Sequence, residues 1–496
     1  MLATAGDPIL DGLEEVASEV HVLDGREPPA RPIERPIDLL VVSSRVGERR
    51  AALLPGIVAG LAPETIACLV EPIDAPVEEA LGGVAEPHRR LVRLRLRYRD
   101  GVLRAVGPAN ASGLLELAAG ARGTDARPRS WLARLRPSTR GRGVVRDVLV
   151  RVVRVAGPAG VEPDEDREEE APEWLTAAAR SGGVDIRGWS WALSTGGAYP
   201  TQKLVWYLGP RGEDRPALVV KQTRNVADNR RLEREFEALR TVGDLDLGPS
   251  TVVPSARFVG RVGDRLVVGE SAVAGVDIRS VVRPGTDDPA LRAVVDWLTR
   301  QALLTRRAVA PGAWSAALGE LLARCEAAYA LAPSESAALR ASIDRLDAAG
   351  GALAAVFGHG DAGAHNILAT PDGRIAPLDW EGAEDAWPPT WDLIYFLRSY
   401  AGTRPRFGAT STARHHLIDG SRLTPALGRA LAAYVADVGV PADLLVDLFH
   451  TCWMHRAVKE AARLPPARRD RGSFVRLLRA GLAAPRIALV EAARAR

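Results

Sequence analysis

A run of acidic residues divides this chain and limits what can form on either side of it. Residues 162–173 read EPDEDREEEAPE, with eight acidic residues, one arginine and two prolines. Such a segment cannot form a packed core of its own, and its like charges repel one another into an extended linker. Only Tyr98 and Trp131 of the 25 aromatic residues precede its end. We therefore expect differently built domains on its two sides, which a length of 496 residues also favours.

Residues 1–161 have the pattern of an α/β domain. Apolar runs at 38–43 and 65–70 are typical of buried strands, whereas 48–61 and 112–121 are typical of helices. No GxGxxG or GxxxxGK motif is present, so the usual phosphate-binding loops are absent. A structural or partner-binding role is favoured, and a protein partner could bind through these residues.

Charge and cysteine content exclude several classes of function. The net charge is +3, so we expect no general affinity for nucleic acid. The last 46 residues hold 11 basic and 3 acidic residues; they could contact phosphate or an acidic partner, although a solvated helix face is favoured. Three cysteines lie far apart without CxxC spacing, and no signal peptide or run of 18 uncharged apolar residues occurs. We expect a cytoplasmic protein without a membrane segment.

Lysine is scarce in this chain. Among 65 basic residues only Lys203, Lys221 and Lys459 are lysine. Coding bias explains the scarcity, because arginine replaces lysine readily at a solvated surface. At a buried point-charge site the two are not interchangeable. Each of the three lysines is therefore a candidate functional residue.

The chain beyond the acidic segment shows a specific order of elements. Three strands come first, then a helix, then two strands joined by a Gly263-Asp264 turn, and then mainly helical sequence. The expected strands are 188–193, 203–208, 217–222, 256–259 and 266–269, and the expected helix is 229–242.

Lys221 ends the apolar strand at 217–222, and the helix that follows offers it a partner. At 100° per residue, Glu235 falls within the apolar stripe formed by Leu232, Phe236, Leu239 and Val242. A carboxylate on a buried helix face needs a cation. Lys221 is the economical partner, and in kinases such a pair directs the lysine toward the phosphates of ATP.

The loop at 194–201 joins the first two of these strands. Taken alone, its two adjacent glycines indicate only a turn. Before the lysine strand, however, it could fold over a triphosphate and donate backbone N–H groups and hydroxyls. The candidate residues of this loop are Ser194, Thr195, Gly196 and Gly197.

The strongest group of polar residues lies at 356–392. Asp361 and Asn366 flank a loop between apolar runs, and Asp379 follows 13 residues later, after a turn at 371–373. Phosphoryl transfer needs one carboxylate near the nucleophile's proton, and a second carboxylate with a neutral oxygen ligand to hold magnesium. Read singly, His359 could be a loop brace and Asp379 a helix cap. Together, and in this order after Lys221, they indicate phosphoryl transfer.

These motifs resemble those of the aminoglycoside phosphotransferase and choline kinase family over about residues 185–400. The matching strings are His359-Gly360-Asp361, Asn366-Ile367-Leu368 and Leu378-Asp379-Trp380-Glu381. The resemblance implies an α+β, two-lobed protein-kinase-like fold that binds ATP, or another nucleoside triphosphate, with Mg²⁺. This fold would follow the separate α/β domain.

The resemblance also implies a role for individual residues. Asp361 would be the catalytic base, Asn366 and Asp379 the magnesium ligands, and Lys221 with Glu235 the phosphate-binding pair. Glu381 would occupy the second acidic position, and Asp392 would brace the catalytic loop. The backbone of residues 270–273, including Glu270 and Ala272, would bind adenine.

The acceptor is expected to be a small hydroxylated molecule, because only 13 residues separate Asp379 from Asp392 and no Ala-Pro-Glu motif follows. Acidic Glu381, Glu384 and Asp385 could attract an amine-bearing acceptor, or could be ordinary loop charges. Helices at 424–438 and 441–464 would build the acceptor site, with His450, Trp453 and His455 as packing groups. Two alternatives stay open: a kinase for a peptide or glycan, and a nucleotide-binding regulator without turnover.

These considerations predict four segments. They are an α/β domain at 1–161, an acidic linker at 162–173, a kinase-like lobe with the ATP loop at 174–270, and a helical lobe with the catalytic loop and acceptor site at 271–496.

Overall fold

The computed structural model describes ten stretches of the chain: residues 39–42, 66–71, 89–99, 102–108, 111–118, 145–154, 171–194, 203–285, 288–403 and 409–495. They fall into two compact units. The first comprises Met1–Asp228 with Arg257–Ala272, and the second comprises Asn229–Ala256 with Val273–Arg496.

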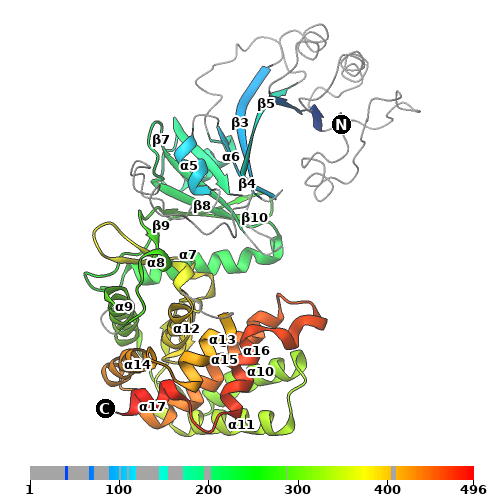
Figure 1. Cartoon of the computed structure of the whole chain (residues 1–496). Coiled ribbons are helices and arrows are strands. Elements are labelled where there is room, and N and C mark those ends of the chain that lie inside the picture. Colours follow the sequence, from blue (N-terminus) through cyan, green and yellow to red (C-terminus); the bar gives the residue numbers. More distant parts are fainter. Residues whose placement is uncertain are drawn as a thin grey trace. The chain divides into compact units, whose positions relative to one another are not determined.

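The first unit contains one ten-stranded sheet (Figure 1). The strand order is β1-β2-β5-β3-β4-β6-β7-β8-β10-β9, in which β1 and β2 run parallel and the other described pairs are antiparallel. The strands are β1 (Leu39–Val42), β2 (Ile66–Glu71), β3 (Arg89–Arg99), β4 (Val102–Pro108), β5 (Val145–Arg154), β6 (Trp189–Ser194), β7 (Leu204–Pro210), β8 (Leu218–Gln222), β9 (Ala256–Val262) and β10 (Arg265–Ser271).

Strands from both sides of the acidic segment are hydrogen-bonded neighbours in this sheet. In the β4–β6 ladder, Ala105 pairs with Ser194 and Val106 pairs with Leu193. Helix α5 (Ser112–Ala118) packs its leucines against Ala105 of β4 and Ala192 of β6. The apolar residues before the acidic segment therefore share a small core with the strands after it. The domain boundaries drawn from the sequence stay a prediction.

The second core of this unit lies between the sheet and helix α6 (Glu173–Ser181). Leu175 and Ala179 of the helix are fully buried, and Trp174 contacts Trp206 of β7 edge to face at 5.4 Å. The strands predicted at 38–43, 65–70, 188–193, 203–208, 217–222, 256–259 and 266–269 are confirmed as β1, β2, β6, β7, β8, β9 and β10. The helix predicted at 112–121 is confirmed as α5, whereas the one at 48–61 lies outside the described residues.

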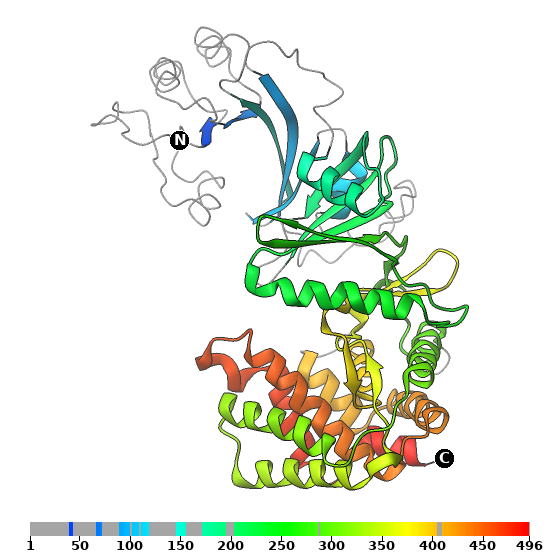
Figure 2. The same cartoon turned by 180° about the vertical axis from the view of Figure 1, so that it is seen from behind.

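The second unit is mainly helical (Figures 1 and 2). Helix α7 (Asn229–Gly243) confirms the helix predicted at 229–242 and buries Glu235 together with Leu232, Leu239 and Val242. The larger helices after it are α9 (Pro289–Thr305), α10 (Ala313–Ala328), α11 (Pro333–Ala348), α12 (Trp391–Ala401), α14 (Thr424–Val438), α15 (Leu445–Ala461) and α16 (Ser473–Ala483).

Helix α15 is the central helix of this unit and contacts α10, α11, α12 and α16. Of its 17 residues, 12 are buried, because neighbouring helices cover it from several sides. Helices α14 and α15 confirm those predicted at 424–438 and 441–464, and Gly439 ends α14 in the left-handed conformation. Trp453 is fully buried, and His455 stacks on Trp391 with ring centroids 5.1 Å apart, so both are packing groups as predicted.

Among the helices that the structure describes, none has the length and apolar character required to cross a membrane.

Candidate active site

The segment at 356–392 folds into short elements around one strand pair. Strand β13 (Ile367–Ala369) pairs antiparallel with β14 (Ile375–Pro377), and the predicted turn between them places Gly373 at φ 84°. Asn366 precedes β13 and Asp379 follows β14, so both lie at the same end of the hairpin. The Leu378 N–H donates to the Asn366 carbonyl at 2.8 Å, which closes that end.

Asp379 has a backbone conformation unusual for a residue other than glycine, with φ 60° and ψ 64° in the left-handed region. An aspartate tolerates this region better than most residues, although the conformation still costs about 1–2 kcal/mol. The turn directs the chain from β14 into the short helix η5 (Trp380–Gly382). The strain is concentrated at the residue that the sequence assigns to the metal.

His359 is a buried brace behind the loop. It follows β12 (Val356–Gly358), and its Nδ1 accepts from the Asp361 N–H at 3.2 Å, so its Nε2–H donates to the Leu378 carbonyl at 3.0 Å. Burial lowers the pKa of His359 to about 4, which keeps the ring neutral and able to play both roles. The ring also packs against Trp380 with centroids 4.4 Å apart.

Asp392, in the first turn of α12, holds the backbone of the same loop. Its carboxylate accepts from the His359 N–H at 2.7 Å and from the Gly360 N–H at 3.0 Å. Burial raises the pKa of Asp392 to about 6, although these hydrogen bonds partly oppose the shift. The contact agrees with the bracing position expected for this residue.

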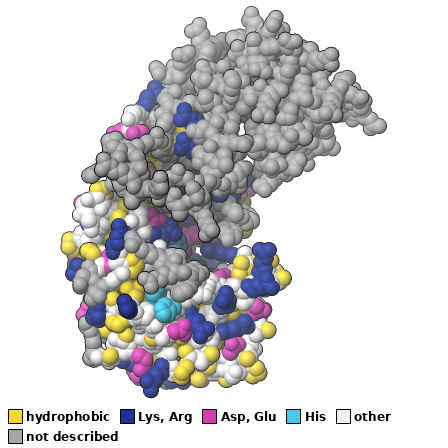
Figure 3. All heavy atoms as spheres, in the orientation of Figure 1, with side chains coloured by type: hydrophobic (Ala, Val, Ile, Leu, Met, Phe, Trp, Pro, Cys, Tyr) yellow, Lys and Arg dark blue, Asp and Glu magenta, His cyan; other side chains and the backbone are white. Residues whose placement is uncertain are grey.

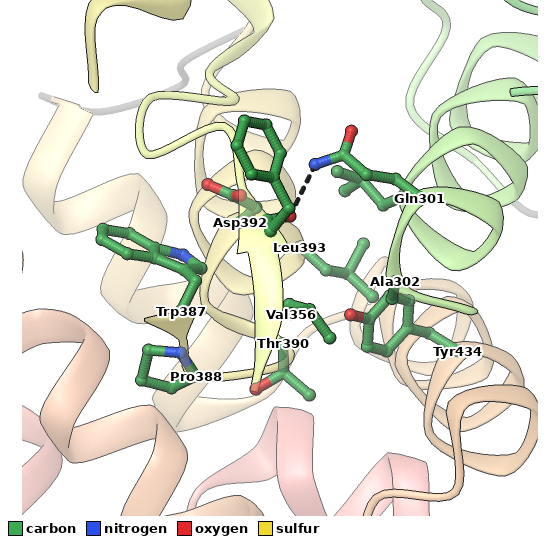
Figure 4. A pocket seen from close by; sticks show the side chains of 11 residues that line it. Gln301, Ala302, Val356, Trp387, Pro388, Thr390, Asp392, Leu393 and Tyr434 are labelled. Atoms are coloured by element: carbon green, nitrogen blue, oxygen red, sulfur yellow. Dashed lines mark hydrogen bonds between the residues drawn. The ribbon is translucent and has the colours of Figure 1, made fainter. Parts of the chain in front are cut away.

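Behind this brace is a small, partly open cavity in the second unit (Figure 4). Gln301 of α9 reaches across it, and its amide donates to the Phe357 carbonyl of β12 at 2.8 Å. Trp387, Thr390 and Asp392 line the opposite wall. The cavity supports the catalytic segment from behind and has no room for a nucleotide or an acceptor.

Asp361 stands at the front of the loop, with its side chain about 20% exposed. The Asn366 amide donates to the Asp361 backbone carbonyl at 3.1 Å and to its Oδ2 at 3.3 Å. His365 Nε2 lies 3.8 Å from the same oxygen. The structure therefore brings Asp361 and Asn366 together, as the sequence predicted, and leaves the Asn366 amide oxygen available as a ligand.

Two cations of α15, which sequence analysis did not place here, contact the front of the loop. Arg456 Nη2 lies 2.5 Å from Asp361 Oδ1, and Arg456 Nη1 and Lys459 Nζ both donate to the Gly360 carbonyl at 3.0 Å. Burial alone would raise the pKa of Asp361, but Arg456, His365 and Lys459 together outweigh burial and hold that pKa well below its ordinary value. The available signal was the scarcity of lysine, which singles out Lys459.

Gly360 is required at its position. Its φ of 72° lies in the left-handed region, and a Cβ there would overlap the Gly382 carbonyl of η5. Gly360 thereby allows η5 and the loop to approach closely. Glu381 lies in the same short helix and is half-buried.

The candidate phosphate-binding lysine belongs to the first unit. Lys221 Nζ forms an ion pair with Glu270 Oε1 at 2.9 Å, and both side chains are almost completely buried. The two residues are diagonal neighbours, because Lys221 of β8 pairs with Val268 of β10. Glu270 therefore contributes a side-chain contact that the sequence did not predict. The pairing of Lys221 with Glu235 stays a prediction.

The remaining predicted nucleotide contacts are described only in part. Ser194 ends β6, whereas Thr195, Gly196 and Gly197 lie outside the described residues. The Ala272 N–H donates to the Ala217 carbonyl at 3.0 Å, so binding of adenine by this amide would replace that hydrogen bond.

A sheet lobe followed by helices, together with this loop, defines a kinase-like phosphotransferase. Residues 196–427 match the family model described as "Phosphotransferase enzyme family". The match confirms the resemblance stated from the sequence and the class of enzyme that it implied. No curated protein matches the chain.

Several solved structures share parts of the fold. The GDP complex of wild-type aminoglycoside 2'-phosphotransferase-IIIa is 13% identical, with a TM-score of 0.38, and covers 62% of this chain and 97% of its own. A glucosamine kinase is 16% identical, with a TM-score of 0.35 and coverages of 68% and 86%. Choline kinase LicA from Streptococcus pneumoniae is 16% identical, with a TM-score of 0.35 and coverages of 57% and 89%.

Proposed function

We propose that this protein transfers the γ-phosphoryl group of ATP, or of another nucleoside triphosphate, to a hydroxyl group of a small molecule. The observation that carries the proposal is the end of the β13–β14 hairpin, which Asn366 precedes and Asp379 follows. Asn366 contacts Asp361 there, and His359 and Asp392 hold the backbone of residues 359–361 and 378. Positioning and electrostatic stabilisation supply most of the catalysis in phosphoryl transfer, and a braced loop provides both.

Asp361 orients the acceptor. Arg456 occupies its Oδ1, so Oδ2 is the oxygen that would accept the hydrogen bond of the acceptor hydroxyl. Its low pKa makes Asp361 a weak base, which suits a reaction whose loose transition state needs little proton removal before the phosphorus–oxygen bond forms. The hydroxyl oxygen bonds to the γ-phosphorus, the nucleoside diphosphate leaves with the electrons of the broken bond, and the proton passes to Asp361.

The residues present fit a magnesium ion. One carboxylate, Asp379, and the amide oxygen of Asn366 are hard oxygen ligands, and they leave positions for phosphate oxygens and water. Bound Mg²⁺ would neutralise charge on the phosphates.

A small acceptor is favoured by the way the segment after Asp379 folds. It forms η5 and then β15 (Glu384–Trp387), which pairs with β12 through Trp387 and Val356. The segment is therefore committed to a strand pair and offers no long loop for docking a peptide. Asp361 engaged by Arg456 favours a second candidate, a nucleotide-binding regulator without turnover.

Formation of the nucleoside diphosphate in the presence of candidate hydroxylated acceptors tests the proposal. Asp361→Asn and Asp379→Asn should each lower kcat at least about 100-fold, while Asp344→Asn, an exposed residue of α11, should leave it unchanged. Activity that survives both substitutions would refute these assignments. Nucleotide binding without turnover of any acceptor would instead support the regulator.

A further inference from the structure

The wall of the candidate acceptor site contributed by α12 and α15 is cationic. Arg456 and Lys459 lie one turn apart on α15 and both donate to the Gly360 carbonyl. Arg398, from the last turn of α12, extends over the Phe474 ring at 5.1 Å from its centroid. The Arg456 guanidinium lies 3.4 Å from the centroid of the Tyr395 ring, between α15 and α12. Aromatic rings thus hold the arginines in place.

One of these three cations has an ion-pair partner among the residues that the structure describes. Asp361 is the ion-pair partner of Arg456, whereas neither Lys459 nor Arg398 forms an ion pair with any residue that the structure describes. Glu460 is close, but its two oxygens accept from the Ser473 N–H and hydroxyl and from the Phe474 N–H at 2.9 Å each. Its charge is therefore committed to the first turn of α16.

Burial lowers the pKa values of two of these cations. Burial, followed by the repulsion of Arg456, lowers the pKa of Lys459 to about 8, although Asp361 and Glu381 oppose the shift. Burial likewise lowers the pKa of Arg398. A buried cation without a counter-charge destabilises the fold unless it serves another purpose. Such groups next to a reactive carboxylate are suited to binding an anion.

More positive charge continues beyond α15. Arg463 adds to the repulsion at Lys459, and the short helix η8 (Pro466–Arg471) carries Arg468, Arg469 and Arg471. Figure 3 shows Lys and Arg side chains gathered over this segment of the second unit. The first basic residues of the last 46, Arg456 and Lys459, thus contact the catalytic-type loop, and others lie along η8.

One of the acidic residues expected to attract an amine is already paired with a cation. Glu384 is half-exposed and forms an ion pair with Arg234 of α7 at 3.1 Å. A polycationic acceptor would approach Asp361 past Arg456 and Lys459, and repulsion between like charges would oppose its binding. Arg456 and Lys459 therefore disfavour an amine group next to Asp361.

We propose that the phosphate acceptor is an anion, a hydroxylated molecule with a carboxylate or phosphate group that Arg456 and Lys459 bind. The inference rests on the proposed phosphotransferase function and names its substrate class. Because Arg456 also contacts Asp361, the anionic group lies within a few bonds of the reacting hydroxyl. A hydroxy acid, a sugar acid and a sugar phosphate share this chemistry.

Acceptors matched in all but charge test the inference on the full-length protein with ATP and Mg²⁺. Glycerate and glycerol phosphate are compared with glycerol, gluconate and glucose phosphate with glucose, and all of these with choline and kanamycin. We expect kcat/KM for the anions to exceed that for neutral and cationic partners at least tenfold. Comparing the two carboxylate acceptors with the two phosphate acceptors shows which anionic group is preferred. Preference for a neutral or cationic acceptor overturns the inference while leaving the phosphotransferase function intact, whereas loss of turnover for every acceptor overturns both.

Variants of Lys459 separate anion binding from support of the fold. Lys459→Gln should raise KM for the preferred anion about tenfold, with kcat and KM for ATP changed less than threefold, and Lys459→Arg should restore most of the loss. Arg340→Gln is the matched control, since Arg340 pairs with Glu326 on the surface of α11 and α10. If Lys459→Gln raises KM equally for the anion and its neutral partner, Lys459 supports only the loop and the inference fails.

Discussion

Arg456 connects the reactive carboxylate to the backbone of its own loop. One guanidinium nitrogen donates to the Asp361 carboxylate and the other donates to the Gly360 carbonyl. A single side chain therefore fixes the carboxylate and the loop backbone. A planar fork with several donors can do this, whereas a lysine could reach only one acceptor well. Lysine is used instead where one point charge suffices, at Lys459 and Lys221. Lys221 is almost completely buried, so charge and compact shape are both needed there.

Lys221→Arg should retain the fold and lose activity. An arginine keeps the charge opposite Glu270, but its longer, planar group cannot occupy the same buried volume. We expect kcat/KM for ATP to fall at least tenfold, with a change in Tm of only a few degrees. Arg265→Lys, an exposed change on β10, should alter neither value and serves as the control. Normal turnover by Lys221→Arg would exclude a role for this lysine at the phosphates.

Asp392 predicts a pH dependence in which activity and stability change in opposite directions. Its native pKa of about 6 lies above the ordinary value of 3.8, so the folded state binds the proton more tightly than the unfolded state does. The stability that this proton contributes is present below about pH 4 and is lost as the pH rises through about 6. The carboxylate needed by the His359 and Gly360 N–H groups forms over the same range, so kcat/KM should rise.

Rate measurements and urea unfolding between pH 4.5 and 8 check this prediction. Asp392→Asn should have low activity and should lack the inflection near pH 6 in both measurements. If the variant keeps the inflection, another group is responsible for it.

At the scale of elements, the local pattern of apolar and polar residues predicted most of the strands and helices, because the formation of these elements depends on nearby residues. The strand at 217–222, the helix at 229–242 with its buried Glu235, and the turn at 371–373 are all present. Contacts between distant elements were not predictable. Arg456 meets Asp361 across 95 residues of sequence, and nothing in the periodicity of α15 indicates which helix face the catalytic-type loop will cover.

Gly360→Ala should disrupt the approach of the loop to η5. A left-handed backbone costs an alanine about 1–2 kcal/mol, and the new Cβ would also overlap the Gly382 carbonyl. We expect a loss of unfolding free energy above about 2 kcal/mol and at least a tenfold loss of kcat. Gly373→Ala isolates the backbone term, because Gly373 has φ 84° but no atom within 4 Å of an added Cβ. Equal effects of the two substitutions would show that the close approach to η5 is unimportant.

At the scale of the whole molecule, the residues before the acidic segment contribute to the sheet that carries Lys221. Strand β4 pairs with β6, and Leu114 and Leu115 of α5 share a core with Ala192 of β6 and Tyr207 of β7. The acidic segment marks a change of composition but does not mark an edge of this sheet. The change of composition at the acidic segment is visible in the sequence because it is local. The pairing of β4 with β6 is not visible there, because strand partners depend on the packing of the whole sheet.

Removal of residues 1–173 should therefore destabilise the remaining protein. The truncated chain 174–496 would expose the edge of β6 and the apolar side chains that α5 covers, and an exposed strand edge promotes aggregation. We expect a fall in Tm of at least about 5 °C and increased light scattering relative to full-length protein. The matched control is full-length protein with a protease site inserted in the acidic segment and then cleaved, in which the two parts should remain associated and active. Residues 174–496 alone could instead be as stable as the full chain and phosphorylate the same acceptor equally well. In that case residues 1–161 would neither complete the sheet nor present an acceptor. A role in binding a separate protein would then be favoured.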